Sequence, residues 1–409
     1  MSGSAGVQPI VVVVAVVLLA VNLRTTVASV PPMLGHIERD LRLSGSAAGL
    51  LTALPVLCMA LFAPAAHRLA HRFGRETTTF GAIALVAAGN GVRLGGGNAV
   101  ALYGGTLAAG LGVAITGVVL PGLIKHVFPR LLGLMTGVYS VAMMLGATVA
   151  AGAAVPLERL LGSWQASLAS WSVPAVLAAV VWLLVAVRVN EPESNDKTPP
   201  GRLPWRRRTA WLLVGFFSLQ AATGYAFLAW LAPAYVARGW SAAAAGALLA
   251  VHNLAQLAAA LVLPALADRL SDPRPAVVGA VAATALGCAW LLAMPDVLPW
   301  AAVAVAGLGL GGGFSLALVL VADFAAHPLA AGRLVALVVL GGYTVAAIAP
   351  VLIGAMRDLT GGFTVPFGVL TAMAVLQVWL GSRLGPSDGP ALADTRRMTR
   401  TWHSPLRLG

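Results

Sequence analysis

A single arginine, Arg24, interrupts the long apolar run VVVVAVVLLAVNLRTTVASV at residues 11–30. A charged side chain at the centre of a membrane-spanning helix costs about 2.5–3.5 kcal/mol on insertion scales, so it is retained where it faces a polar cavity. A guanidinium donates two parallel hydrogen bonds and suits planar acceptors such as a carboxylate or a nitro group. Arg24 is therefore a candidate ligand for a small anionic or polar solute. The structural alternative is that it binds helix-end carbonyls inside a bundle.

Further polar and aromatic side chains lie in other apolar runs, and Asn253 and Gln256, three residues apart, share one helical face. A cavity built from such side chains would bind a flat heterocycle by stacking and hydrogen bonds. For each Tyr or Gln alone, a hydrogen bond between helices explains the residue equally well. Asn22 is about 200° around the helix from Arg24, so the two cannot both point straight into one cavity. The candidate substrate-binding residues are Arg24, Asn22, Tyr139, Gln220, Tyr225, His252, Asn253 and Tyr343.

Carboxylates are scarce in the apolar runs: of the 14 acidic residues, Asp323 alone falls within one, near its end. His252 is the central group that titrates near neutral pH. Three options remain open, namely proton coupling through His252, a protonated substrate, or uncoupled exchange. A hydrogen-bonding role is the ordinary alternative for a lone histidine in a helical bundle. A proton is therefore a candidate partner.

Motifs for other chemistry are missing. The sequence has no zinc-ligand spacing, no catalytic triad and no P-loop, so we expect no enzyme activity, no metal, no cofactor and no ATP-driven pumping. The glycine-rich run at 307–313 contains G-x-G-x-x-G, but it has no preceding strand and lies within an apolar run. Close packing of helices explains it better than dinucleotide binding.

The elements that must position these residues are membrane helices. Only 10% of residues are charged, against about 25% in soluble domains, 59% are hydrophobic, and the mean hydropathy is +0.88. Runs of about 20 apolar residues predict an all-α membrane protein with twelve transmembrane helices. We place these spans near 9–33, 46–66, 77–95, 99–124, 131–154, 165–187, 210–234, 243–266, 275–293, 299–325, 333–355 and 363–383.

Charge placement predicts the orientation. With both termini in the cytoplasm, 19 of the 26 basic residues fall in cytoplasmic segments and six, Arg93 among them, on the outer side. The net charge of +12 is then explained by topology and by attraction to lipid headgroups, and nucleic-acid binding is not expected. We expect a multi-pass protein of a bacterial inner membrane. Trp230 and Trp240 are expected to anchor the outer membrane interface.

The polar, proline-rich segment 188–209 divides the chain into halves that echo each other. LAHR at 69–72 recurs as LADR at 266–269, and Pro129 matches Pro328. Parallel repeats of six spans are typical of transporters whose halves rock about a central site. We predict an N-terminal six-helix half at 1–187, a cytoplasmic linker at 188–209, a C-terminal six-helix half at 210–384 and a cytoplasmic tail at 385–409.

The loop HRLAHRFGRE at 67–76 resembles the signature between spans 2 and 3 of the major facilitator superfamily. Arg72, Gly74 and Arg75 match that signature, whereas His71 stands in place of its Asp. The second-half copy keeps the acid as Asp268, next to Arg269. The resemblance implies that these motif residues take part in gating. The gating contact of this signature would then depend on the acid of the C-terminal half, or His71 would make that contact sensitive to pH. The ordinary alternative is a surface loop that tolerates a histidine.

Other stretches, including NLR at 22–24, GLLTALPVL at 49–57, VVLPGLIK at 118–125 and YAFLAWLAPAYVARGW at 225–240, resemble the cyanate and 2-nitroimidazole transporter family. This resemblance implies a monomeric rocker-switch carrier in the lipid bilayer that moves a small, nearly planar polar or anionic solute. An alternative is a broader drug-efflux pump, but the run at 137–147 lacks the proline of the antiporter signature. A membrane sensor or scaffold is a remote alternative, since neither linker nor tail has room for a soluble domain.

Overall fold

The computed structural model describes residues 9–186, 208–267, 269–270, 272, 274–323 and 328–383, and this part of the chain is helical without strands. The predicted linker and the tail fall almost entirely outside these residues. The N-terminal half contains α1 (Pro9–Ala28), η1 (Pro31–Met33), α2 (Leu34–Leu41), α3 (Gly45–Phe73), α4 (Arg75–Val92), η2 (Arg93–Gly95), α5 (Ala99–Val127), η3 (Pro129–Leu131), α6 (Leu132–Leu161), α7 (Trp164–Ser170) and α8 (Ser172–Ala186). The C-terminal half contains α9 (Arg208–Ala237), α10 (Ala242–Ala267), α11 (Arg274–Ala293), α12 (Pro299–Asp323), α13 (Pro328–Thr360) and α14 (Thr364–Arg383).

The prediction of an all-α membrane fold is confirmed, with a qualification on the number of spans. Within the described residues, 11 helical segments are long and apolar enough to cross a membrane. The remaining predicted span, 77–95, coincides with α4, which begins with Arg75 and Glu76 and includes three threonines and Asn90. Its polar residues lower its mean hydropathy below that of the 11 counted segments. It nevertheless packs against α5 and α8.

Local sequence signals end the helices where the chain must turn. The hydroxyl of Ser44 accepts a hydrogen bond from the Ala47 backbone N–H and caps α3, and Asn98 caps α5 in the same way. Gly74 joins α3 to α4 with φ of +82°, a conformation that costs a glycine little. The match of Gly74 to the loop signature therefore has a backbone reason.

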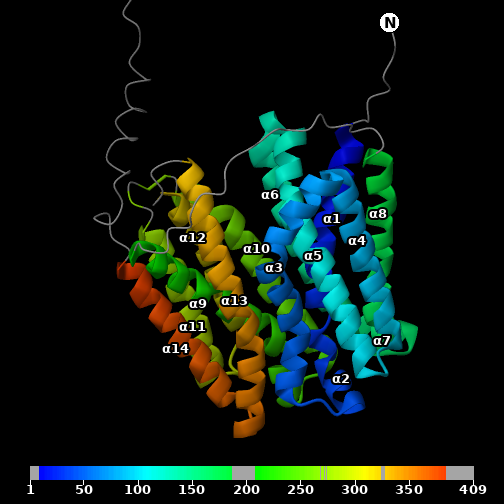
Figure 1. Cartoon of the computed structure of the whole chain (residues 1–409). Coiled ribbons are helices and arrows are strands. Elements are labelled where there is room, and N and C mark those ends of the chain that lie inside the picture. Colours follow the sequence, from blue (N-terminus) through cyan, green and yellow to red (C-terminus); the bar gives the residue numbers. More distant parts are fainter. Residues whose placement is uncertain are drawn as a thin grey trace, which may run out of the picture.

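The two halves lie side by side, with the helices of each running between two common ends (Figure 1). We call the end that carries α2 and α7 the α2 end. The opposite end, where α1 and α9 begin, is the linker end. At the α2 end, α3 packs against α13 and α6 packs against α10.

Glycines bring these helix pairs of opposite halves into backbone contact. A Cβ atom at Gly49 of α3 would overlap the Pro350 carbonyl of α13, and one at Gly354 of α13 would overlap the backbone of Gly45. Such small residues allow helix backbones to approach closely in a membrane, where lipid removes the usual hydrophobic drive for association. The predicted packing role of the 307–313 run has the same basis, because Gly309 and Gly311 of α12 abut the backbones of α11 and α10.

An ion pair joins the halves at the same end. Arg357 of α13 donates from Nη1 to Glu38 Oε1 and from Nη2 to Glu38 Oε2 (3.1 Å), and both side chains are largely shielded from solvent. Beside it, the Ser46 N–H donates to Asp358 Oδ2 (3.3 Å). Closely packed glycines and charge-assisted hydrogen bonds therefore close the α2 end.

The short helix α2, which the sequence analysis did not predict, holds three partners at alternate residues. His36 Nδ1 lies 2.6 Å from Glu158 Oε1 of α6, and Asp40 accepts a 2.6 Å hydrogen bond from Trp164 of α7. Glu38, between them, reaches Arg357 in the other half. Two of the three contacts therefore fasten α2 to its own half.

Trp230 corrects the expectation of a membrane-interface anchor. Its side chain is 1% exposed, and its indole N–H donates to the Pro350 carbonyl at 2.8 Å within the C-terminal half. The Arg357 guanidinium carbon lies 5.4 Å from its ring centroid. The Trp230 ring therefore packs against the cation of the ion pair instead of facing lipid headgroups.

Candidate functional site: a central cavity between the halves

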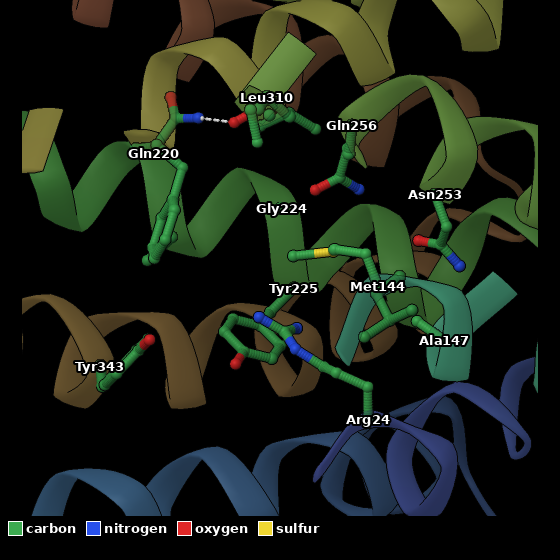
Figure 2. Close-up of a pocket in the computed structure, with 15 residues that line it drawn as sticks. Arg24, Met144, Ala147, Gln220, Gly224, Tyr225, Asn253, Gln256, Leu310 and Tyr343 are labelled. Carbon is green, nitrogen blue, oxygen red and sulfur yellow. Dashed lines mark hydrogen bonds between the residues drawn. The ribbon is translucent and has the colours of Figure 1, made fainter. Parts of the chain in front are cut away.

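A cavity of about 60 Å³ lies between the two halves, and Figure 2 shows the side chains around it. A cavity of this volume holds a few water molecules. The N-terminal half contributes Arg24, Met144 and Ala147. The C-terminal half contributes Gln220, Ala221, Gly224, Tyr225, Leu228, Asn253, Gln256, Ala260, Leu310, Gly311, Phe314 and Tyr343.

Arg24 is the charged residue of this lining. It lies in the C-terminal part of α1, which is held closely against α6 because Gly146 abuts the backbone of Val21. The guanidinium carbon lies 5.4 Å from the ring centroid of Tyr225, and Figure 2 shows the two groups side by side. Among the described residues, no carboxylate pairs with Arg24 and none lines the cavity. The cation is therefore fixed against a ring from the opposite half without a counter-charge there.

Amide side chains on α9 and α10 supply the neutral hydrogen-bonding groups. Gln220 donates to the Leu310 carbonyl (2.6 Å) and accepts from Gln377 of α14 (2.6 Å), so its orientation is fixed. Asn253 is 3% exposed and its Nδ2 has no hydrogen-bond partner among the described residues. Gln256 lines the cavity one turn further along α10.

Aromatic rings form a further part of the wall. The rings of Tyr225 and Tyr343 meet edge to face at 6.2 Å, and Phe217 contacts Tyr343 in the same manner at 6.1 Å. Tyr139 does not line the cavity, but it lies close to Arg24. The predicted tyrosines of the two halves are therefore grouped around the arginine.

Two predicted site residues lie elsewhere. Asn22 is fully buried and donates to the carbonyls of Leu18 (2.8 Å) and Pro174 (3.1 Å), on the side of α1 that faces α8. His252 is also fully buried, donates from Nδ1 to the Val303 carbonyl (3.1 Å) and stacks on Phe227. Neither side chain is part of the cavity lining.

The structure brings Arg24, Gln220, Tyr225, Asn253 and Tyr343 of the predicted set together. It adds Gln256, Met144 and Phe314, which the predicted set omits. For Gln256 the signal was present, since it shares a helical face with Asn253. For the apolar pair no sequence signal distinguishes a cavity wall from ordinary packing.

The predicted gating residues are only partly described. Arg72 is exposed and its guanidinium lies 5.3 Å from the ring of Phe73. The Arg75 carbonyl accepts from Thr79 within α4, and Arg269 is exposed near the end of α10. Asp268 lies outside the described residues. The gating role of this motif stays a prediction.

The arrangement suits a solute with one negative or strongly electronegative edge and a flat face. Arg24 can donate two parallel hydrogen bonds to the edge, and the rings can contact the face. The amides of the opposite half can bind further polar atoms. Because the cation belongs to one half and the amides to the other, a bound solute would touch both.

Comparison with known proteins identifies the family of the chain. Residues 13–327 match the Major Facilitator Superfamily. The chain is 30% identical to an uncharacterized transporter of Bacillus subtilis (strain 168), covering 93% of this chain and 94% of that protein. In Escherichia coli (strain K12) it is 30% identical to a 2-nitroimidazole transporter (92% and 95% covered) and 32% identical to the cyanate transport protein CynX (92% and 97% covered).

A solved structure supports the fold independently. The crystal structure of a D-xylose–proton symporter superposes with a TM-score of 0.74 at 15% identity, covering 93% of this chain and 98% of that one. At this identity the likeness concerns the fold alone. The family match and the full-length relatives extend it to the kind of protein, a multi-pass membrane transporter of small molecules and not an enzyme. The chain belongs to the Major Facilitator Superfamily.

Proposed function

We propose that this transporter carries a small, planar, polar or monoanionic solute, similar to cyanate or a nitroimidazole, by alternating access between its two halves. The observation that carries the proposal is Arg24, a cation in the cavity without a carboxylate among the described residues. An uncompensated charge is costly in a membrane interior. A solute that supplies the missing negative charge is therefore favoured over a cation or a neutral hydrocarbon.

The relatives support the same solute class. Two of them, at 30% and 32% identity, are named for 2-nitroimidazole and for cyanate. Cyanate is a small linear anion and 2-nitroimidazole is a planar ring, and both offer electronegative atoms that a guanidinium beside two tyrosine rings can bind. A broad drug-efflux function fits less well, because the cavity is small and carries a charge and three amides.

The excess of basic residues predicts that the linker end faces the cytoplasm of a bacterial cell and that both termini lie there. In that orientation the closed α2 end faces outward, which favours an inward-facing state, and we propose that the carrier works as a monomer. The transport cycle then requires that the contacts between α3 and α13 separate while the linker end closes. The solute assists this step because its binding groups come from both halves.

Proton coupling needs a titratable group that communicates with the solute. His252 is buried away from the cavity and bonded to a backbone carbonyl, so we infer a structural role for it. Coupling, where it exists, then uses a protonated solute or another group. The expected result is that His252→Gln leaves the dependence of transport on a pH gradient unchanged in proteoliposomes. A gradient dependence that disappears in this variant contradicts the inference.

The solute class is tested by thermal unfolding of purified protein with cyanate, 2-nitroimidazole, benzoate and, as a cation of similar size, benzylamine. We expect stabilisation by one or more of the first three and none by benzylamine. Arg24→Ala should abolish this stabilisation. Arg39→Ala is the matched control, because Arg39 is exposed and, among the described residues, bonds to the Gly35 carbonyl of its own helix alone. A ligand that stabilises wild type and Arg24→Ala equally contradicts the proposal.

A further inference from the structure

Arg93, in η2 at the α2 end, is a second arginine in an apolar setting. Loop position and charge counting placed it on the outer surface, yet its side chain is 0% exposed. It is held close against neighbouring backbone, since a Cβ at Gly105 of α5 would lie 3.1 Å from Arg93 Cγ. A buried guanidinium loses its hydration and needs compensating partners.

Hydrogen bonding satisfies only one side of this guanidinium. Nη1 donates to the Thr26 carbonyl (3.1 Å) in the last turn of α1, a helix end with partial negative charge. Nε and Nη2 have no hydrogen-bond partner among the described residues. These two atoms form one edge of the planar group, and their N–H bonds point outward from that edge, parallel to each other. Arg93 therefore presents an intact bidentate donor edge inside the protein.

Another arginine of the chain shows what this edge binds when an acceptor is supplied. Arg238 donates from Nε to Asp296 Oδ1 (3.0 Å) and from Nη2 to Asp296 Oδ2 (2.6 Å). Arg93 forms no such pair with a described carboxylate. Asp40 of α2 accepts a hydrogen bond from the indole of Trp164, not from Arg93. The acceptor for Arg93 therefore does not come from the described part of the chain.

The segments that Arg93 and Asn90 contact carry further unpartnered groups. Asn90, one turn earlier, donates to Thr26 Oγ1 (3.2 Å) and to the Trp171 carbonyl (3.5 Å). The Asn90 Oδ1 atom, the Trp171 indole N–H and the Ser29 hydroxyl are buried without partners among the described residues. The indole and the guanidinium are donors only, the Asn90 amide oxygen is an acceptor and the Ser29 hydroxyl can be either, so donors outnumber acceptors in this set.

We propose that Arg93 forms a buried site for a small monovalent inorganic anion, a halide or a planar oxyanion such as nitrate, between α1, α4 and α7. This site is distinct from the central cavity, because Arg93 does not line that cavity. The anion accepts hydrogen bonds from Nε and Nη2 and neutralises the guanidinium. It thereby joins the end of α4 to the end of α1, the helix that carries Arg24.

The test is thermal unfolding at fixed ionic strength, with sodium gluconate replaced stepwise by sodium chloride, bromide or nitrate. Gluconate is too large for a site closed to solvent. We expect a saturable rise of about 2–4 °C in the unfolding midpoint of wild type. Arg24→Ala should keep this rise, whereas Arg93→Gln should lose it. General salt effects cancel because all variants are measured in the same salts.

A rise of equal size in Arg93→Gln, or none in wild type, overturns the proposal. A second measurement covers the case in which Arg93→Gln does not fold. Wild-type crystals grown in bromide should show anomalous scattering within hydrogen-bonding distance of Arg93 Nε and Nη2, and its absence there overturns the proposal. Neither result bears on the solute of the central cavity, which the Arg24 variant tests separately.

Discussion

Arg24 and Arg357 resemble each other in setting and differ in partner. Each guanidinium carbon lies 5.4 Å from the centroid of an aromatic ring on α9, Tyr225 for Arg24 and Trp230 for Arg357. Arg357 is also bonded in a bidentate manner to Glu38, whereas Arg24 pairs with no described carboxylate. Both arginines connect the two halves.

The difference teaches how one residue type serves two purposes at a moving interface. A cation with a permanent counter-charge across the interface stabilises one arrangement of the halves. A cation without one leaves its binding energy available for a solute that comes and goes. Cation–π attraction alone is worth about 0.5–2 kcal/mol, enough to orient Arg24 without neutralising it.

Solute binding should show the largest contrast between the two arginines. Hydrogen bonds to charged groups contribute about 1.5–3 kcal/mol, so Arg24→Gln should weaken solute binding on the order of 10–100-fold. Arg357→Gln should leave affinity within a few-fold of wild type, since its side chain is outside the cavity. Isothermal titration with the best ligand of the thermal screen measures both. Equal losses in the two variants would remove the distinction.

A steric wedge should open the α2 end more strongly than loss of a charge. A side chain at Gly354 would overlap Gly45 of the opposite half, and overpacking costs about 1–3 kcal/mol. Gly354→Val should therefore increase the population with a separated α2 end on the order of tenfold or more. Gly368→Val on α14 is the matched control, because nothing lies within 4 Å of a Cβ there.

Spin labels at Leu160 of α6 and Leu359 of α13 report this separation. Both side chains are exposed, at 79% and 87%, and they belong to opposite halves at the α2 end. Pulsed dipolar spectroscopy should show a longer distance population in Gly354→Val and the wild-type distribution in Gly368→Val. A wild-type distribution in both variants would mean that the glycine contact does not limit opening.

Loss of the ion pair should have a smaller effect on the same distance. Glu38→Gln leaves Arg357 without its charge partner, and partial exposure of both side chains reduces the cost below that of a fully buried pair. We expect an intermediate shift of the label distance toward separation. The difference between wild type and Glu38→Gln should shrink as the salt concentration is raised, because salt weakens the wild-type ion pair, which is not fully shielded from solvent. An unchanged distribution in Glu38→Gln would assign closure to the glycines alone.

The smallest effect should come from the pair that lies within one half. Arg238 and Asp296 make a similar bidentate contact, but both belong to the C-terminal half and are exposed. Asp296→Asn should leave the label distance unchanged. A shift as large as that of Glu38→Gln would show that the distance responds to any lost charge at this end.

The same pair gives a small pH effect of known sign. The hydrogen bond from Arg238 holds the pKa of Asp296 below its ordinary value. The pair's contribution to stability is therefore present above the ordinary carboxyl pKa and is lost as the pH falls through the lowered value. Wild type should lose slightly more thermal stability than Asp296→Asn between pH 5 and pH 3, with the opposite sign contradicting the assignment.

Features that depend on local composition, or on one residue that departs strongly from it, could be predicted from the sequence. Apolar runs located the spans, and a charge inside the first of them located the cavity at Arg24. Asn22 was wrongly placed among the candidate binding residues: it bonds to the Leu18 and Pro174 carbonyls, in line with its position about 200° around the helix from Arg24. The sequence could not show that Arg93 is buried, because a loop arginine has the same sequence context whether it faces water or protein.

Long-range contacts account for the other differences. Trp230 reads as an interface anchor by its place near a span end, yet its partner Pro350 lies 120 residues away. The helix α2 is short and polar, and its three partners come from α6, α7 and α13. Such pairings depend on the packed fold and leave no local pattern in a single sequence.

The alternate side chains of α2 have a consequence for intervention from outside the cell. His36 and Asp40 tie the helix to its own half, so it should travel as a rigid flap when Glu38 leaves Arg357. In the proposed orientation this flap and the turn at 361–363 face the external medium. An antibody fragment that grips both surfaces at once would arrest the carrier without entering the membrane or competing with its solute.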